Sequence, residues 1–249
     1  MGVFNRVAKN ARLGDGYVGI GTSNVNANAR FFTTNQEMLF HKRKMCEEDG
    51  FVVGSIGTQR SGYGGTKTIY NFYVRVDERF TKVVNSPLID IIKDLTEEDI
   101  FLWYLDDGSW HKTTNTMHLY SNGLNKEESE VLIGVISNLY GVKPIIRIDR
   151  KRDGREFFYL YFPRDLVRII RPKIKEYILN NSLDTLLYKV GGRDYEDKDS
   201  VVASENEVRE IRRLREVEGK TLSEISEIVG MSISRISRIS NYETYKNIV

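Results

Sequence analysis

Hydrophobic and polar positions divide the first 190 residues into two similar series of elements. Alternation of apolar and polar residues predicts strands, and a repeat of three to four residues predicts helices. The first series has strands at residues 17–21 and 29–34, a helix at 36–48, strands at 51–58 and 67–76, and a further helix. The second has a short strand near Ser109, a strand at 116–121, a helix at 126–140, strands at 143–150 and 156–162, and a helix at 163–177. A predicted helix ending in Asp-Gly precedes each series, so the pattern predicts a duplicated αββαββα unit with halves at about 1–95 and 96–190.

The strands of this unit have two unlike faces. In the strand at 67–76, apolar side chains alternate with Asn71, Tyr73 and Arg75, and in the strand at 156–162 they alternate with Tyr159 and Tyr161. We therefore expect the α+β fold class, with two antiparallel sheets that each pack one face on helices. Because sheets twist, their outward faces predict a saddle-shaped surface able to enter the ~12 Å major groove of DNA.

Residues 205–249 have a different, wholly helical pattern. A charged amphipathic helix is predicted at 206–218. Thr221 and Glu224 form a capping pattern for a second helix, and Gly230 predicts the turn after it. Ser232 then opens a third helix, so the order resembles a helix-turn-helix.

The third helix of this module carries positive charge only. It carries Arg235 and Arg238 and no acidic residue, which is typical of a helix that contacts DNA. We expect DNA contacts from Ser232, Ser234, Arg235 and Arg238. A helical hairpin that serves structure or dimerisation is the alternative.

A formal net charge of +2 conceals an uneven distribution along the chain. Residues 143–193 contain thirteen Lys and Arg against six Asp and Glu, whereas residues 194–205 contain five acids and one Lys. The basic stretch favours a polyanionic partner, with a solvated surface as the alternative. The acidic stretch is typical of a linker. We therefore expect one domain at 1–190, a linker at 191–204 and a small all-α domain at 205–249.

Composition narrows the chemistry that the chain can perform. A chain of 249 residues with 40% hydrophobic content can build a substantial core. With Cys46 as its only cysteine and with three histidines, it has no internal disulfide and few ligands for zinc, which leaves the oxygen ligands that Mg²⁺ prefers. No apolar run approaches the ~18 residues of a membrane span, and residues 1–10 lack a secretory pattern. We expect a cytoplasmic protein that is not secreted.

Asp15 and Asp107 are the strongest candidates for a reactive site. Each ends a predicted helix and precedes a glycine. A carboxylate at a helix C-terminus faces the negative end of the helix dipole, so the position is unfavourable unless a cation is near. An isolated Asp-Gly is more often an ordinary turn, but its recurrence within the duplication favours a shared metal ion.

The motifs around the two acids resemble those of the LAGLIDADG homing endonucleases, in the single-chain form with two motif copies. The resemblance covers residues 6–190. The first half is carried by Leu13-Gly14-Asp15-Gly16-Tyr17 and Asn28-Ala29-Arg30-Phe31. The second is carried by Trp103-Tyr104-Leu105-Asp106-Asp107-Gly108-Ser109 and Leu119-Tyr120-Ser121-Asn122. Arg171-Pro172-Lys173-Ile174 and Leu187-Tyr188-Lys189-Val190 resemble the end of the family's domain.

This resemblance implies roles for particular residues. Asp15 and Asp107 would bind Mg²⁺, or another divalent cation such as Mn²⁺, with the carbonyls of Gly14 and Asp106 nearby. Lys189 matches a basic residue that assists catalysis, and Lys82 is the expected counterpart in the first half. The residues expected to contact DNA from the sheets are Arg30, Asn71, Arg75, Arg147 and Arg155.

The two motif helices depart from the family pattern where they are expected to touch. The family favours small residues there, whereas the first helix has Lys9 and Asn10 and the second has Trp103 and Tyr104. Polar groups buried without partners are costly, so these positions put the expected helix contact in question.

The resemblance implies a monomeric, site-specific endonuclease that cuts both strands of a long DNA target. Such enzymes belong to intron-encoded or free-standing mobile elements, and the C-terminal module would extend the DNA contact. Two alternatives stay open: a non-cleaving DNA-binding regulator with a LAGLIDADG-like fold, and an RNA maturase that aids splicing, for which intron RNA would be a further partner. The retained acids favour the endonuclease.

Overall fold

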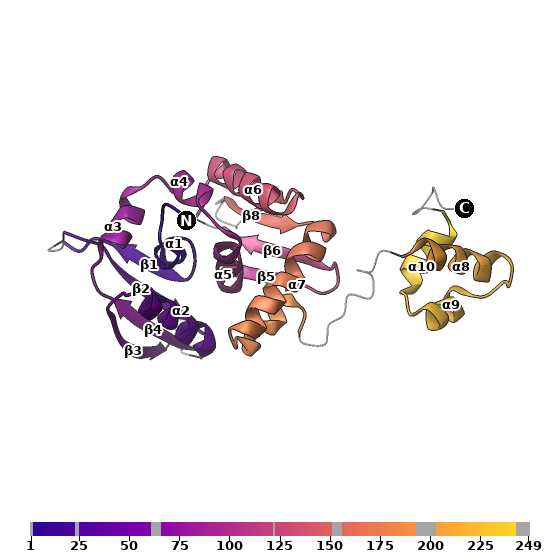
Figure 1. Cartoon of the computed structure of the whole chain (residues 1–249), viewed down its shortest axis with the longest axis horizontal. Coiled ribbons are helices and arrows are strands. Elements are labelled where there is room, and N and C mark those ends of the chain that lie inside the picture. The colour runs from indigo at the N-terminus through magenta and orange to yellow at the C-terminus, as the bar shows by residue number, and fades with distance from the viewer. Residues whose placement is uncertain are drawn as a thin grey trace. The chain divides into compact units, whose positions relative to one another are not determined.

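The chain forms two compact units, Met1–Arg193 and Asp194–Val249, each with its own hydrophobic core (Figure 1). The computed structural model describes residues 2–22, 25–60, 66–121, 123–150, 156–192 and 203–242. Among these residues no helix combines the length and the apolar character that crossing a membrane requires.

The first half of the larger unit contains one four-stranded antiparallel sheet. Its elements are α1 (Arg6–Leu13), β1 (Gly16–Gly19), β2 (Asn28–Thr33), α2 (Gln36–Glu48), β3 (Val53–Arg60), β4 (Thr68–Val74) and α3 (Glu78–Asn85). The strand order is β1-β2-β4-β3. A short helix, α4 (Leu88–Lys93), leads to the second half.

The second half repeats this architecture. Its elements are α5 (Glu97–Asp107), β5 (Gly108–His111), β6 (Thr116–Tyr120), α6 (Lys126–Tyr140), β7 (Ile145–Arg150), β8 (Glu156–Phe162), α7 (Arg164–Asn180) and the 3₁₀ helix η1 (Asp184–Val190). The strand order β5-β6-β8-β7 is equivalent to that of the first sheet, which confirms the predicted duplication and the α+β fold class.

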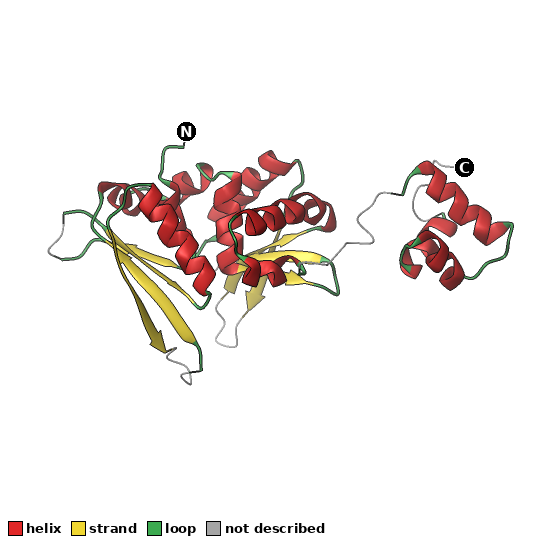
Figure 2. Cartoon of the chain, turned by 60° about the horizontal axis from the view of Figure 1, so that its bottom comes forward, coloured by secondary structure: helices red, strands yellow, loops and turns green. Residues whose placement is uncertain are grey.

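Helices cover one side of both sheets and leave the other side open (Figure 2). The covered faces carry the core residues Phe31, Phe72, Leu119 and Leu160, none more than 1% exposed. On the open side, Tyr73 of β4 is 40% exposed, as the alternation in this strand predicts. The buried apolar faces therefore fix which sheet surfaces remain available to a partner.

The two halves meet along α1 and α5, which lie side by side (Figure 1). Lys9 of α1 is 2% exposed, and its Nζ lies 2.6 Å from Asp99 Oδ2 of α5 and 2.8 Å from the Asp94 carbonyl oxygen. Asp99 also completes a capping box with Thr96 at the start of α5. The polar residue that departs from the family pattern is thus paired across the interface, which offsets the cost of burying it.

The smaller unit consists of three helices, α8 (Glu205–Glu216), α9 (Leu222–Val229) and α10 (Ile233–Ser240). Thr221 and Glu224 form the expected capping box, and Ser232 caps α10. Gly230 has φ +68° at the turn, a left-handed conformation that glycine adopts without strain. Val208, Ile211, Ile225 and Ile236 are fully buried among the three helices. An all-α unit is present as predicted, and its identity as a DNA-binding helix-turn-helix stays a prediction.

Candidate active site

Asp15 and Asp107 lie where the two motif helices end. Gly14 caps α1 and Asp15 follows it, while Asp107 is the last residue of α5. A Cβ on Gly14 would collide with the Asp106 carboxylate, so the end of the first motif helix packs closely against the second. The helix contact therefore brings together the ends that carry the acids.

Burial and mutual repulsion make the ionised forms of both acids unfavourable. Burial, followed by the charges of Asp15 and Asp106, raises the pKa of Asp107 to about 7. Burial and the charge of Asp106 likewise raise the pKa of Asp15, and Lys42 and Lys189 partly oppose this rise. A divalent cation between the two carboxylates would remove this penalty.

Lys189 lies at this site, as the resemblance implies. It is 7% exposed on η1, and its Nζ donates to the Asp106 carbonyl oxygen at 2.7 Å. The Tyr104 hydroxyl donates to the Lys189 carbonyl oxygen at 2.7 Å, so this bulky residue of α5 anchors η1. Burial lowers the pKa of Lys189, while Asp106, Asp107 and Asp15 oppose that shift.

Lys82 does not join the acids. Its Nζ donates to the Val3 carbonyl oxygen at 2.8 Å and lies 5.4 Å from the centre of the Phe4 ring. Val3 and Phe4 precede α1 whereas Asp15 follows it, and eight helical residues span about 12 Å. The sequence pattern could not show toward which end of α1 the helix that carries Lys82 would point.

A different lysine of the first half, Lys42 of α2, lies at this site, where it contacts Asp106. The sequence motifs did not identify it. Its side chain is 2% exposed, and its Nζ lies 2.6 Å from Asp106 Oδ1 and 2.7 Å from Oδ2. A signal existed, because Lys42 shares helical spacing with the buried residues Met38, Leu39 and Met45. A lysine within an apolar helix face requires a buried partner.

The site can accept a hard divalent cation. Among the described residues, no group of three or more His, Cys, Asp and Glu side chains could hold a metal ion. Mg²⁺ does not require one, because it commonly binds one or two carboxylates together with water and substrate phosphates. The carbonyls of Gly14 and Asp106 already accept hydrogen bonds from the Gly16 N–H and from Lys189, and each keeps a second lone pair. Asp15 and Asp107 therefore form a donor set that suits Mg²⁺.

A cavity of about 240 Å³ adjoins the second acid. Asp107, Trp103 and Arg12 contribute to its wall. Liquid water occupies about 30 Å³ per molecule, so the cavity is large enough for several waters beside the Asp107 carboxylate. Trp103, the other bulky residue of the motif helix, thus borders solvent space at the site.

On the outward face of the first sheet, the predicted DNA contacts are unequal. Arg30 and Arg75 are exposed. Asn71 is 7% exposed, accepts a hydrogen bond from Arg30 Nη2 at 3.0 Å and donates one to the Gly57 carbonyl at 3.2 Å. Asn71 therefore holds Arg30 in place and does not face solvent as predicted.

On the second sheet, the outward face is aromatic. Arg147 is exposed, and its guanidinium lies 5.5 Å from the centre of the Tyr161 ring. His118 lies 4.0 Å from His111 and 5.2 Å from Tyr159 by ring centres. Burial and the neighbouring His111 lower the pKa of His118 to about 4, so its imidazole is neutral at pH 7. No local sequence pattern indicates a role for these histidines. Arg155, the other predicted contact of this sheet, lies outside the described residues.

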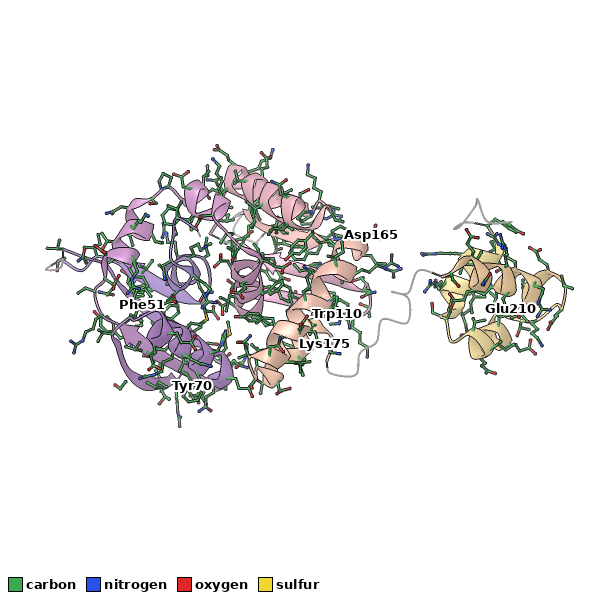
Figure 3. All side chains as sticks on the ribbon, in the orientation of Figure 1. Phe51, Tyr70, Trp110, Asp165, Lys175 and Glu210 are labelled. Atoms are coloured by element: carbon green, nitrogen blue, oxygen red, sulfur yellow. The ribbon has the colours of Figure 1, made fainter. Side chains whose placement is uncertain are left out.

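The other face of β5 is packed against a helix. Trp110 lies beside α7 (Figure 3), and the guanidinium carbon of Arg171 from this helix lies over the Trp110 ring, 5.0 Å from its centre. Ser109 and His111, on either side of Trp110, point the other way and are joined by a 3.0 Å hydrogen bond. The alternation of β5 therefore separates a core side from a side open to a partner.

In the C-terminal unit, the residues predicted to contact DNA lie along α10. Ser232 caps the helix, and the Arg235 N–H donates to the Ser232 side chain at 3.4 Å. Ser234 and Arg238 are exposed and Arg235 is half-buried. The charge of α10 is entirely positive.

Comparison with models of known protein families identifies the family of the chain. The model of the LAGLIDADG DNA endonuclease family matches residues 12–170, a segment that includes both acids and both sheets. The chain belongs to this family. No curated protein matches the chain.

The chain is similar to several solved structures, of which I-WcaI shares its fold. The homing endonuclease I-WcaI, bound to its DNA recognition sequence, is 17% identical with a TM-score of 0.60, covering 76% of this chain and 88% of that chain. I-DmoI in complex with DNA and Mn is 17% identical with a TM-score of 0.45, covering 67% and 96%. Full-length DUF199/WhiA from Thermatoga maritima is 10% identical with a TM-score of 0.44, covering 98% and 92%.

Proposed function

We propose that the chain is a divalent-metal-dependent homing endonuclease that cuts both strands of a long DNA site. The observation that carries the proposal is the meeting of Asp15 and Asp107, two desolvated carboxylates at the ends of adjacent helices. Such a pair is unfavourable without a cation and suits a metal-dependent hydrolase. Bound Mg²⁺ would supply an activated water and stabilise the leaving oxygen.

The remaining roles belong to the residues around this pair. Asp15 and Asp107 would hold the cation, and the carbonyls of Gly14 and Asp106 would be available as further oxygen ligands. The Lys189 ammonium is held by the Asp106 carbonyl and keeps two further N–H donors. It therefore stabilises negative charge that develops on the phosphate.

The open faces of the two sheets bind the DNA. Arg30, Arg75 and Arg147 contact phosphates or base edges, and the tyrosines of the second sheet add apolar and hydrogen-bonding surface. I-WcaI, which shares the fold, was solved with its DNA recognition sequence. Because one chain supplies both acids, a monomer has a complete site.

The C-terminal unit extends this contact. Arg235 and Arg238 provide positive charge on one helix of a unit with its own core. Such a helix suits a DNA groove or its phosphates. We propose that the unit binds DNA beside the cleavage site and lengthens the protected region.

Cleavage of DNA from the gene's own insertion region tests the proposal. Wild-type protein with Mg²⁺ or Mn²⁺ should convert a plasmid that carries this DNA from supercoiled to linear. Asp15→Asn and Asp107→Asn should abolish linear product while retaining binding in Ca²⁺. The exposed Asp90 offers a matched control, and Asp90→Asn should cleave as wild type does.

Two results would contradict these assignments. Wild-type cleavage rates in either active-site variant would remove that carboxylate from the mechanism. Specific binding by the wild type without cleavage in either metal would favour a regulator with the same fold.

A further inference from the structure

Asp106 of the second half forms several contacts with the first half. Its side chain is fully buried, and both carboxylate oxygens contact Lys42 Nζ from α2. Its Oδ2 also accepts hydrogen bonds from Asn10 Nδ2 at 3.1 Å and from the Asp15 backbone N–H at 3.2 Å. One side chain of the second half therefore holds three groups of the first half.

These contacts reach both proposed metal ligands through the backbone. The Asp15 N–H belongs to the peptide between Gly14 and Asp15, so its bond to Asp106 orients the residue that carries the first carboxylate. Asp106 directly precedes Asp107, which carries the second, and its carbonyl holds Lys189. Close packing of Gly14 against the Asp106 carboxylate leaves little room for the two ends to shift.

Neither Asp106 nor Lys42, its ion-pair partner, is placed to contact DNA. Lys42 is 2% exposed, and its Nζ also lies 5.7 Å from the centre of the buried Phe31 ring, on the covered face of the first sheet. The Asp106 carboxylate is engaged by the Lys42 ammonium through both oxygens. Because the Asp106 carboxylate and the Lys42 ammonium contact each other in a buried position, we do not assign metal binding to Asp106 or phosphate binding to Lys42. Both residues are instead placed to position their neighbours.

We propose that Asp106 and Lys42 form a positioning pair that sets the placement of Asp15 relative to Asp107 across the contact of the two halves. The inference rests on the proposed function, because it assigns the pair to the metal site of that reaction. Lys42 neutralises the buried Asp106 charge, and Asp106 Oδ2 aligns the Asp15 peptide. Preorganisation of this sort places ligands before the cation arrives.

Two double variants of the full chain separate positioning from stability. Lys42→Met/Asp106→Asn removes both charges and keeps a side-chain oxygen that accepts the Asp15 N–H. Lys42→Met/Asp106→Leu also removes both charges but has no acceptor. Removing a buried ion pair as a whole is much better tolerated than removing one partner, so both double variants should unfold at a higher temperature than the single variants. The Leu double variant should unfold somewhat below the Asn double variant, because the Asn10 side chain and the Asp15 N–H lose their acceptor.

The readouts are Mn²⁺ binding by calorimetry, cleavage rate under saturating DNA, and affinity for the DNA in Ca²⁺. We expect the Asn double variant to stay within about threefold of wild type, since the hydrogen bond persists. The Leu double variant should lose Mn²⁺ affinity and cleave about 10- to 100-fold more slowly, with DNA affinity unchanged, since small misplacements of reacting groups carry such costs.

Equal Mn²⁺ binding and cleavage by the two double variants would overturn the positioning role. If the Leu double variant does not fold, Lys42→Met/Asp106→Ala makes the same comparison with a smaller side chain. A wild-type chain that neither binds Mn²⁺ nor cleaves overturns the proposed function, and the inference with it. If the wild type binds Mn²⁺ and cleaves DNA, and the two double variants do so equally well, the inference is overturned and the proposed function stands.

Discussion

Replacing Asp107 with Asn should stabilise the metal-free protein at pH 8. In the folded chain, burial and the neighbouring acids raise the pKa of Asp107 from 3.8 to about 7. The unfolded chain releases this proton near pH 3.8 and the folded chain keeps it until about pH 7. The proton therefore favours the folded state below pH 3.8, and stability is lost as the pH rises from 3.8 to 7.

The size of the effect follows from the shift in pKa. Each unit corresponds to about 1.4 kcal/mol, so the shift sets a ceiling of about 4 kcal/mol above pH 7. Asp15 shares the repulsion, and partial exposure of Asp107 reduces the penalty. We expect a gain of about 1–3 kcal/mol from Asp107→Asn, which corresponds to roughly 3–10 °C in Tm for a domain of this size.

Tryptophan fluorescence in a chelator offers a direct assay. Trp103 and Trp110, the two tryptophans of the chain, both belong to the larger unit, so their signal reports its unfolding alone. Asp107→Asn should melt above wild type at pH 8 and equal it at pH 4, and Asp90→Asn should not show this pattern. Added Mg²⁺ should raise the wild-type Tm more than that of the variant. An Asp107→Asn protein that melts at or below the wild-type temperature at pH 8 would refute the electrostatic reasoning.

Other perturbations test separate parts of the structure. Lys189→Met should slow cleavage with little change in DNA affinity, as measured under saturating and limiting DNA, because its charge acts mainly on the transition state. Removing everything after Ala203 should leave a metal-dependent nuclease, while the salt dependence of binding falls by about one slope unit per lost cation–phosphate contact and the footprint shortens at one end. An unchanged footprint would show that the C-terminal unit serves another purpose. Lys9→Met should lower the stability of the larger unit by roughly 3–5 kcal/mol in denaturant titrations, since it leaves Asp99 buried without its cation. Burial lowers the pKa of His41 to about 4, so its contribution to stability is full above pH 6.5 and is lost as the pH falls toward 4; His41→Gln should reduce this acid sensitivity.

Periodicity in the sequence predicted the strands of both sheets, the main helices and the duplication, but it did not predict the short helices α4 and η1. The predicted and observed bounds of α2 and α6 coincide, and the start of each is fixed by an Asn cap whose side chain accepts a backbone N–H group. The outward face of β4 was only partly predicted. Alternation places Asn71 outward, but its burial depends on Arg30 reaching it from β2, and strand pairing cannot be read from one strand.

The candidate site shows the same limit more strongly. The motifs located Asp15, Asp107 and Lys189, since each lies within a local pattern. Lys42 is distant in sequence from Asp106 and was missed, and Lys82 was assigned by its place in the chain. A single segment could not show that Lys42 lies at the site or that Lys82 lies near Val3, because the charge balance at the site depends on which helices converge in space.

The acids also lie at joints between the helical contact and the open sheets. Asp107 ends α5 and the next residue, Gly108, begins β5; Asp15 alone separates Gly14, the cap of α1, from Gly16, the start of β1. Each carboxylate is therefore directly followed in the chain by the first residue of a strand, so a movement of the sheet also moves the carboxylate. Under the proposed function, each sheet binds one half of the DNA target. A mismatched sequence that tilts a sheet would then displace the adjoining carboxylate, so a mismatch would slow cleavage as well as weaken binding.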